Sequence, residues 1–122
     1  HGSLGSFATA YLPPGAKIDE IIARLAAVPG IEVVYDRARG CRRFELPEDR
    51  MGDIIIVSER LTVLGTSRER HDLSGLTVPL RSHGGISEQT VPLLFNRRAN
   101  GVDRSRRLRN FDVFDIALNH LQ

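Results

Sequence analysis

The chain has 122 residues, of which 41% are hydrophobic and 26% charged, with a formal net charge of +2 at neutral pH. This length suffices for one domain with a buried core, and the apolar fraction is too high for a disordered chain. The apolar runs are short, such as Ile54–Val57, and fall far below the ~18 residues of a membrane span. Composition therefore predicts a single globular domain that does not cross a membrane.

Cysteine and arginine usage adds two expectations. Cys41 is the single cysteine, so no internal disulfide forms, and we expect a reducing, cytoplasmic compartment. The opening residues, His1–Gly5, lack the basic and apolar regions of a signal peptide. Lys17 is the one lysine among 17 basic residues, and the rest are arginines. Arginine suits bidentate binding of carboxylate or phosphate. A GC-rich genome gives the same bias, and composition leaves both explanations open.

The first 35 residues predict a strand–helix–strand unit. Residues 7–12 predict a strand that ends at Pro13-Pro14-Gly15. Apolar residues then recur at helical spacing over Ile18–Ala26, and Pro29-Gly30 ends this helix. The β-branched and aromatic residues Ile31–Tyr35 predict a second strand. A unit of about 30 residues has the size of a βαβ motif or of half a ferredoxin-like fold.

The middle of the chain predicts a short helix and a buried strand. Asp36–Leu46 fits an amphipathic helix with Cys41 inward, although Gly40 weakens it by up to ~1 kcal/mol. Asp53–Ser58 holds three isoleucines and a valine in a row, which indicates a parallel-type strand buried on both faces. Leu61–Leu64 is a further apolar run, which we expect to pair with that strand. Together these elements indicate an α/β sheet covered on two sides.

The residues from Gly65 to Thr90 show no periodicity and predict a loop of about 25 residues. A structureless loop of this length is usually functional or disordered. We therefore expect any functional site to lie in this loop, whose candidate residues are His71, Asp72, Arg81, His83, Gly84, Gly85 and Glu88.

The C-terminal third predicts an edge strand, an arginine-rich segment and a final helix. Val91–Phe95 is apolar, and Pro92 favours an edge position. The segment that follows contains Arg97, Arg98, Arg104, Arg106, Arg107 and Arg109. Asn110 then fits the N-cap of a helix, with one apolar face made of Phe111, Phe114, Leu118 and Leu121.

Spacing alone gives weak signals for chemistry. Zinc needs three or four converging ligands, whereas the four histidines form no HxxxH pair and Cys41 stands alone. His83 is the best single candidate ligand, because the two glycines after it let backbone and metal approach closely and permit unusual φ and ψ angles. The ordinary alternative is a surface histidine. His71 and Asp72 are adjacent, and a solvated loop pair is the favoured interpretation. Cys41 is expected to pack rather than react.

The arginines offer a second class of function, a non-catalytic binding module that uses Arg97–Arg109 for an anionic partner. Phosphates are the obvious ligands for such a cluster. Nucleic acid is not favoured, because Asp103 and Asp112 interrupt or flank the arginines and no aromatic platform lies among them.

Three stretches of the sequence carry a family resemblance: Met51–Gly65, His71–Leu80 and Arg81–Asn96. Together they closely resemble the C-terminal part of the phosphonoacetate hydrolases, zinc enzymes of the alkaline phosphatase superfamily. The opening residues His1–Phe7 also look like an internal segment of these enzymes. The likeness covers most of residues 1–96 and is most specific over 81–96.

The resemblance implies a fragment of an α/β, alkaline-phosphatase-like core with part of a smaller α+β, ferredoxin-like cap. Residues 1–48 would be the βαβ-like cap segment and 49–122 the C-terminal segment of the core. The implied reaction is hydrolysis of the C–P bond of phosphonoacetate, or of a related small phosphonate, to acetate and phosphate. Two zinc ions beside a Thr nucleophile would polarise the phosphonate and activate that nucleophile.

One family site residue maps onto this chain. His83, within Ser82-His83-Gly84-Gly85, matches a late histidine that ligates one of the two zinc ions. The nucleophile and the remaining ligands lie earlier in the family's sequence, and their motifs are absent here. The resemblance thus implies a piece of a longer enzyme, inactive alone, whether natural, engineered or proteolytic in origin. We expect it to dimerise or to associate with its missing N-terminal part through exposed apolar edges.

Overall fold

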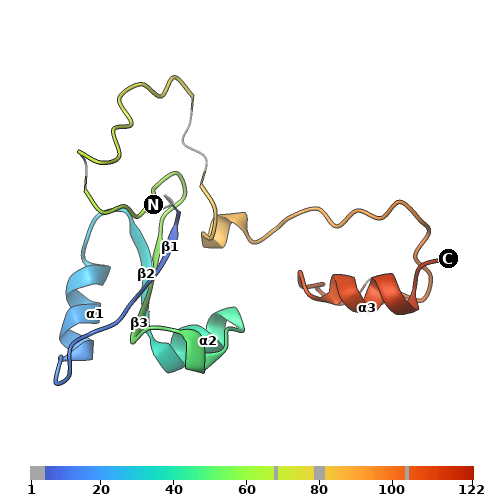
Figure 1. Cartoon of the computed structure of the whole chain (residues 1–122), viewed down its shortest axis with the longest axis horizontal. Coiled ribbons are helices and arrows are strands. Elements are labelled where there is room, and N and C mark those ends of the chain that lie inside the picture. The colour runs from blue at the N-terminus through green and yellow to red at the C-terminus, as the bar shows by residue number, and fades with distance from the viewer. Residues whose placement is uncertain (1–4, 68, 79–81, 104) are drawn as a thin grey trace. The chain divides into compact units, whose positions relative to one another are not determined.

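The computed structural model describes residues 5–67, 69–78, 82–103 and 105–122. The chain forms two compact units, residues 1–90 and 91–122. The first contains all the strands named here, and the second contains α3 (Figure 1). In chain order the elements are β1 (Phe7–Ala10), α1 (Ile18–Ala26), β2 (Ile31–Asp36), α2 (Arg37–Phe44), η1 (Glu48–Arg50), β3 (Ile54–Ser58), η2 (Ile86–Glu88) and α3 (Asp112–Asn119).

The sheet has the order β1-β3-β2, and β3 is antiparallel to both neighbours. β1 and β2 are therefore parallel to each other with α1 between them in sequence, which is a split βαβ arrangement. The predicted strand–helix–strand unit is confirmed. The prediction of a parallel-type strand over 53–58 is wrong in direction, because a continuous apolar run reports burial on both faces and not the direction of the neighbours. The fold is α+β.

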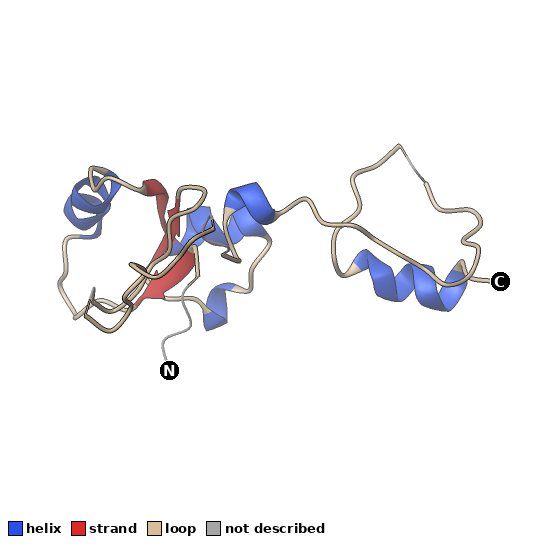
Figure 2. Cartoon of the chain, turned by 90° about the horizontal axis from the view of Figure 1, so that it is seen from above, coloured by secondary structure: helices blue, strands red, loops and turns tan. Residues whose placement is uncertain are grey.

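Burial of β3 on both faces is confirmed. Ile54, Ile55 and Val57 are at most 1% exposed. Figures 1 and 2 show α1 and α2 on opposite sides of the sheet. Because facing residues of adjacent strands share a face of the sheet, Phe7 and Val33 lie on the same face as their partner Val57. That face packs against α2, around Cys41.

Helix α2 begins at a side-chain cap and approaches the sheet closely. The Asp36 carboxylate accepts a hydrogen bond from the Arg39 amide at 2.7 Å, as an N-cap residue should. Gly40 is buried, and a Cβ placed on it would lie 2.5 Å from Cδ1 of Ile55. The glycine that weakens helix propensity is therefore what lets the helix backbone rest on β3.

Two predicted strands are absent from the described residues. Leu61–Leu64 turns back instead of extending: Leu61 is left-handed at φ 66°, and the Leu64 amide donates to the Gly5 carbonyl at 2.8 Å. Val91–Phe95 contains no strand. Its proline removes one donor, and Leu94 is 85% exposed, so burial contributes little to fixing this segment.

The final helix forms, but a different face of it is buried. Phe114 and Leu118 are 70% and 83% exposed, whereas Ile116 is 1% exposed. The cap differs as well, since Phe111 and not Asn110 occupies the N-cap position. The sequence predicts that Phe111, Phe114, Leu118 and Leu121 share one face of the helix, but spacing identifies an apolar stripe and not what covers it.

A buried carboxylate organises the start of α3. Asp112 accepts hydrogen bonds from the Arg109 amide at 2.7 Å and from the guanidinium groups of Arg109 and Arg106 at 3.3 and 3.1 Å. These donors, the backbone amide above all, hold the pKa of Asp112 below its usual range against the opposing effect of burial. Two of the six arginines therefore neutralise a carboxylate of their own segment.

The division into a cap of 1–48 and a core segment of 49–122 stays a prediction. The boundary between the compact units falls between residues 90 and 91 of the sequence. Strand β3 belongs to the same sheet as β1 and β2, which lie within residues 7–36. A cap limited to residues 1–48 would lack the central strand of its own sheet. Among the helices that the structure describes, none combines the length and apolar character needed to cross a membrane.

Replacing Gly40 by Ala tests the close approach of α2 to β3. We expect a loss of about 1–3 kcal/mol in unfolding free energy, because the new methyl group overpacks against Ile55 and this outweighs the gain in helix propensity. Urea denaturation measures the change. Gly75→Ala, with nothing within 4 Å, is the matched control. Adding Ile55→Val, which removes Cδ1, should recover part of the loss; a Gly40→Ala variant as stable as the parent contradicts the packing argument.

The depressed pKa of Asp112 predicts acid sensitivity in the second unit. A carboxylate with a lowered folded-state pKa adds stability above its unfolded value, about pH 3.9, and loses it as pH falls through the lower folded value. NMR titration should therefore show the Arg109 amide shift changing below about pH 3.9. Asp112→Asn should abolish this transition, whereas Asp115→Asn on the exposed face should leave it. Titration of Asp112 at an ordinary value would contradict the prediction.

Candidate functional site

The His83 segment lies against the N-terminal end of β1. The Ser6 amide donates to the His83 carbonyl at 2.8 Å, and the Ser82 and Ser6 hydroxyl oxygens are 2.7 Å apart. The His83 side chain is exposed. The candidate residue is thus presented at the surface of a segment whose backbone is anchored.

The two glycines after His83 are required by this geometry. Gly84 has φ +85°, and a Cβ there would lie 2.9 Å from Cβ of Phe7. Gly85 is buried, and its amide donates to the Glu88 carboxylate at 2.6 Å, at the start of η2. Glycine permits both the positive φ and the close contact. The unusual backbone conformation that these glycines permit is confirmed at Gly84, whereas close approach of a metal stays a prediction.

The imidazole of His83 packs on Gly5. A Cβ on Gly5 would lie 2.9 Å from Cε1 and 3.3 Å from Nδ1 of His83, so that edge of the ring faces the Gly5 backbone. Within the described ranges, no group of three or more histidine, cysteine, aspartate or glutamate side chains is arranged to hold a metal ion. Because zinc needs three or four protein ligands or water, the residues described here do not make up a complete zinc site.

The other histidine of the loop does not pair with its neighbouring acid. His71 Nε2 lies 3.2 Å from the Thr66 hydroxyl, while Asp72 accepts the Ser74 amide at 2.9 Å. This amide, together with the Ser74 hydroxyl, lowers the pKa of Asp72. Both side chains line a shallow cavity of about 590 Å³ that also includes Glu69. The pair behaves as two separate loop residues, as the ordinary interpretation predicts. Arg81 lies outside the described residues.

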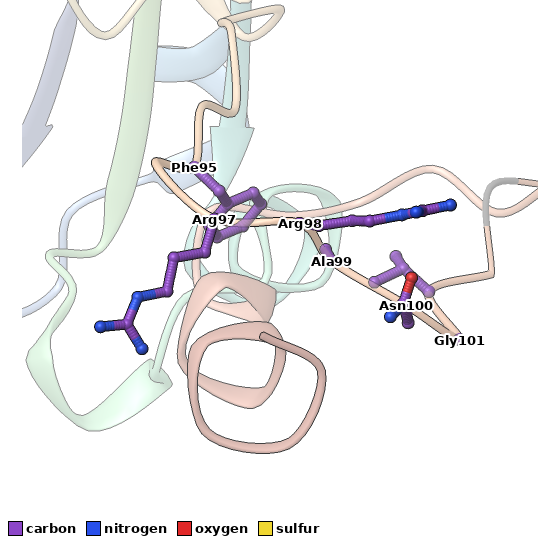
Figure 3. A pocket seen from close by; sticks show the side chains of 7 residues that line it. Phe95, Arg97, Arg98, Ala99, Asn100 and Gly101 are labelled. Carbon is purple, nitrogen blue, oxygen red and sulfur yellow. The ribbon is translucent and has the colours of Figure 1, made fainter. Parts of the chain in front are cut away.

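The arginine-rich segment does not converge on one site. Arg97 and Arg98 line an open pocket of about 480 Å³, but their side chains point away from each other (Figure 3). Arg106 and Arg109 bind Asp112, and Arg104 lies outside the described residues. Recognition of phosphate requires guanidinium groups aimed at a common point. The described geometry therefore gives no support to an anion-binding module.

Cys41 packs in the core, as predicted. It is 3% exposed beside Ile55 and Val57. Burial raises the pKa of its thiol, which keeps the less reactive thiol form. Cys41 is therefore a packing residue.

Sequence reasoning missed the residues that hold His83. Gly5, Ser6 and Thr62 lie far from it in sequence, and all three contact its segment or the residues that anchor it. Their proximity to His83 follows from tertiary structure alone, and no signal in the sequence identifies them.

Known proteins that match this chain are phosphonoacetate hydrolases. No protein-family model matches the chain. A Penicillium oxalicum protein named phosphonoacetate hydrolase is 63% identical over 30 residues, covering 24% of this chain and 42% of that protein. Two crystal structures of phosphonoacetate hydrolase from Sinorhizobium meliloti match far more of it. The complex with phosphonoacetate is 59% identical with a TM-score of 0.75, over 93% of this chain. The complex with phosphonoformate is 58% identical with a TM-score of 0.74, over 91%.

The chain spans only a part of these relatives. It corresponds to 28% and 27% of the two solved chains. Sequence and fold agree over nearly all of the 122 residues, and so the resemblance predicted from Met51–Gly65, His71–Leu80 and Arg81–Asn96 is confirmed: this chain is similar to a segment of phosphonoacetate hydrolase.

Proposed function

We propose that this chain is a segment of a hydrolase that cleaves the C–P bond of phosphonoacetate, or of a related small phosphonate. The observation that carries the proposal is the 59% identity and TM-score of 0.75 to a phosphonoacetate hydrolase solved in complex with phosphonoacetate. A backbone that follows its relative over 93% of the chain supports a shared role for the segment. In this proposal the segment belongs to an alkaline-phosphatase-like core and its cap.

The proposed reaction is a hydrolysis. Phosphonoacetate and water give acetate and phosphate: the C–P bond breaks, the water oxygen ends on phosphorus and a proton ends on the released carbon. Among the described residues, the Ser82 hydroxyl is hydrogen-bonded to that of Ser6, and in this proposal the nucleophile comes from a part of the enzyme outside this segment. We therefore expect the 122-residue chain to be inactive alone.

His83 is the residue that we propose contributes to catalysis, as one ligand of one of two zinc ions. Its exposed ring and its anchored backbone suit a ligand that must meet others from outside the described residues. Such a site would bind a metal only when the remaining ligands are supplied.

The first test of this function uses the longest natural product of the gene. It should release phosphate from phosphonoacetate and contain zinc by elemental analysis. His83→Ala should lower kcat/KM by at least about 100-fold and reduce zinc content, because one ligand is lost. His71→Ala, in the same loop but bound to Thr66, is the matched control and should keep both.

One outcome would reject the proposed activity, and another would reject the proposed role of His83. One is a natural product that does not hydrolyse phosphonoacetate or any related small phosphonate. The other is a His83→Ala variant with the zinc content and activity of the parent, which would leave the hydrolase assignment but remove His83 from the metal site. The 122-residue chain assayed alone should show no phosphate release.

Association of the chain stays a prediction, and the structure suggests where to test it. Several large apolar side chains are exposed among the described residues, with Leu94 at 85% and Leu118 at 83%. Exposed apolar groups of this kind favour association. Light scattering after gel filtration should show the 122-residue chain as a dimer or larger, and Leu94→Ser with Leu118→Ser should shift it toward monomer. A monomeric parent at micromolar concentration contradicts the prediction.

A further inference from the structure

A chain of buried hydroxyl groups lies beneath the His83 segment. Ser6 and Ser58 are each 1% exposed. The Ser6 hydroxyl donates to the Thr62 carbonyl at 2.9 Å, and the Ser58 hydroxyl donates to the same carbonyl at 2.7 Å. A carbonyl oxygen has two lone pairs, so these two donors satisfy it.

The direction of the next hydrogen bond follows from counting protons. A serine hydroxyl has one proton, and that of Ser6 is directed at Thr62. At a distance of 2.7 Å, the Ser82 hydroxyl must therefore donate to Ser6. Ser6 thus joins Ser82, from which it is separated by 76 positions of sequence, to the turn after β3.

The backbone of Ser6 adds a second link. Its amide donates to the His83 carbonyl at 2.8 Å, and its carbonyl accepts from the Ser58 amide at 2.9 Å. Its neighbour Gly5 supports the ring, whose Nδ1–Cε1 edge lies closest to the Gly5 backbone. The His83 segment is therefore held by backbone and side chain at once.

We propose that Ser6, acting through Ser82 and together with Gly5, is a positioning residue that fixes the backbone and ring of His83 so that the imidazole is presented to a metal ion. This inference rests on the proposed function, in which His83 is a zinc ligand. Ser58 shows what a purely structural serine does here. It is equally buried and donates to the same carbonyl, but has no bond to the His83 segment.

The first experiment needs only the 122-residue chain. Ser82→Ala and Ser6→Ala should speed hydrogen exchange of the residue 6 amide, relative to amides of β3, by about 5- to 30-fold, because the segment that accepts its hydrogen bond is released. Ser82→Thr keeps the hydroxyl and should restore slow exchange. Ser58→Ala is the matched control: it should speed exchange of all amides together, with no excess at residue 6.

The second experiment measures zinc affinity in the longest natural product of the gene, by competition with a chelator and zinc alone. Ser6→Ala and Ser82→Ala should weaken zinc binding by about 10- to 100-fold, the usual effect of losing a residue that orients a ligand. Ser58→Ala should keep the affinity of the parent, and so should Ser82→Thr.

The outcomes separate the two proposals. If Ser6→Ala and Ser58→Ala behave alike in exchange, or if zinc affinity is unchanged while exchange is faster, the serines only stabilise the fold and the positioning role is wrong. If His83→Ala leaves zinc affinity unchanged, the ligand assignment fails, whatever the serine variants do in exchange. The inference is supported if Ser6→Ala and Ser82→Ala both speed exchange of the residue 6 amide relative to amides of β3 and weaken zinc binding, while Ser58→Ala and Ser82→Thr do neither.

Discussion

Hydrogen bonding along both edges of β3 is the constraint on which the first compact unit depends. β1 pairs with one edge and β2 with the other, both antiparallel. Because Ile54, Ile55 and Val57 are almost fully buried, the peptide groups of β3 have no access to water and need these partners. The approach of α2 follows from the same strand, since Gly40 rests directly on Ile55. A strand buried in this way leaves little freedom for the elements around it.

The His83 segment is connected by hydrogen bonds to the C-terminal end of β3. Ser58 closes β3, and its amide and hydroxyl bind Ser6 and Thr62. Ser6 then binds Ser82 and His83. Of these hydrogen bonds, those of Ser6 to Ser82 and to the His83 carbonyl are the ones that reach the His83 segment directly. The position of an exposed imidazole thus depends on the register of a buried sheet.

How much was predictable from the sequence differs between local and nonlocal features. Ile18–Ala26 and the helix after Asp36 follow from spacing and capping within a few residues, and both form. The direction of β3 did not follow, because three isoleucines in a row indicate burial equally for parallel and antiparallel neighbours. His83 was found by resemblance, since a histidine before two glycines is a weak signal. Ser6 could not be found, because its relation to His83 exists only after β1 and the loop meet.

The contacts of residues 82–85 show how this segment holds its one candidate ligand, His83. Residues 82–85 pack against the N-terminal end of β1. Gly84 and Gly85 allow the close approach, and Ser6 binds the Ser82 hydroxyl and the His83 carbonyl. A metal ligand contributes one lone pair, and its value to a site lies in where that lone pair is held. A segment that holds an exposed imidazole on an anchored backbone can supply it to a metal centre whose other ligands come from elsewhere. In the proposed function, such a centre would be complete only when both parts are folded against each other, which would couple metal binding to folding.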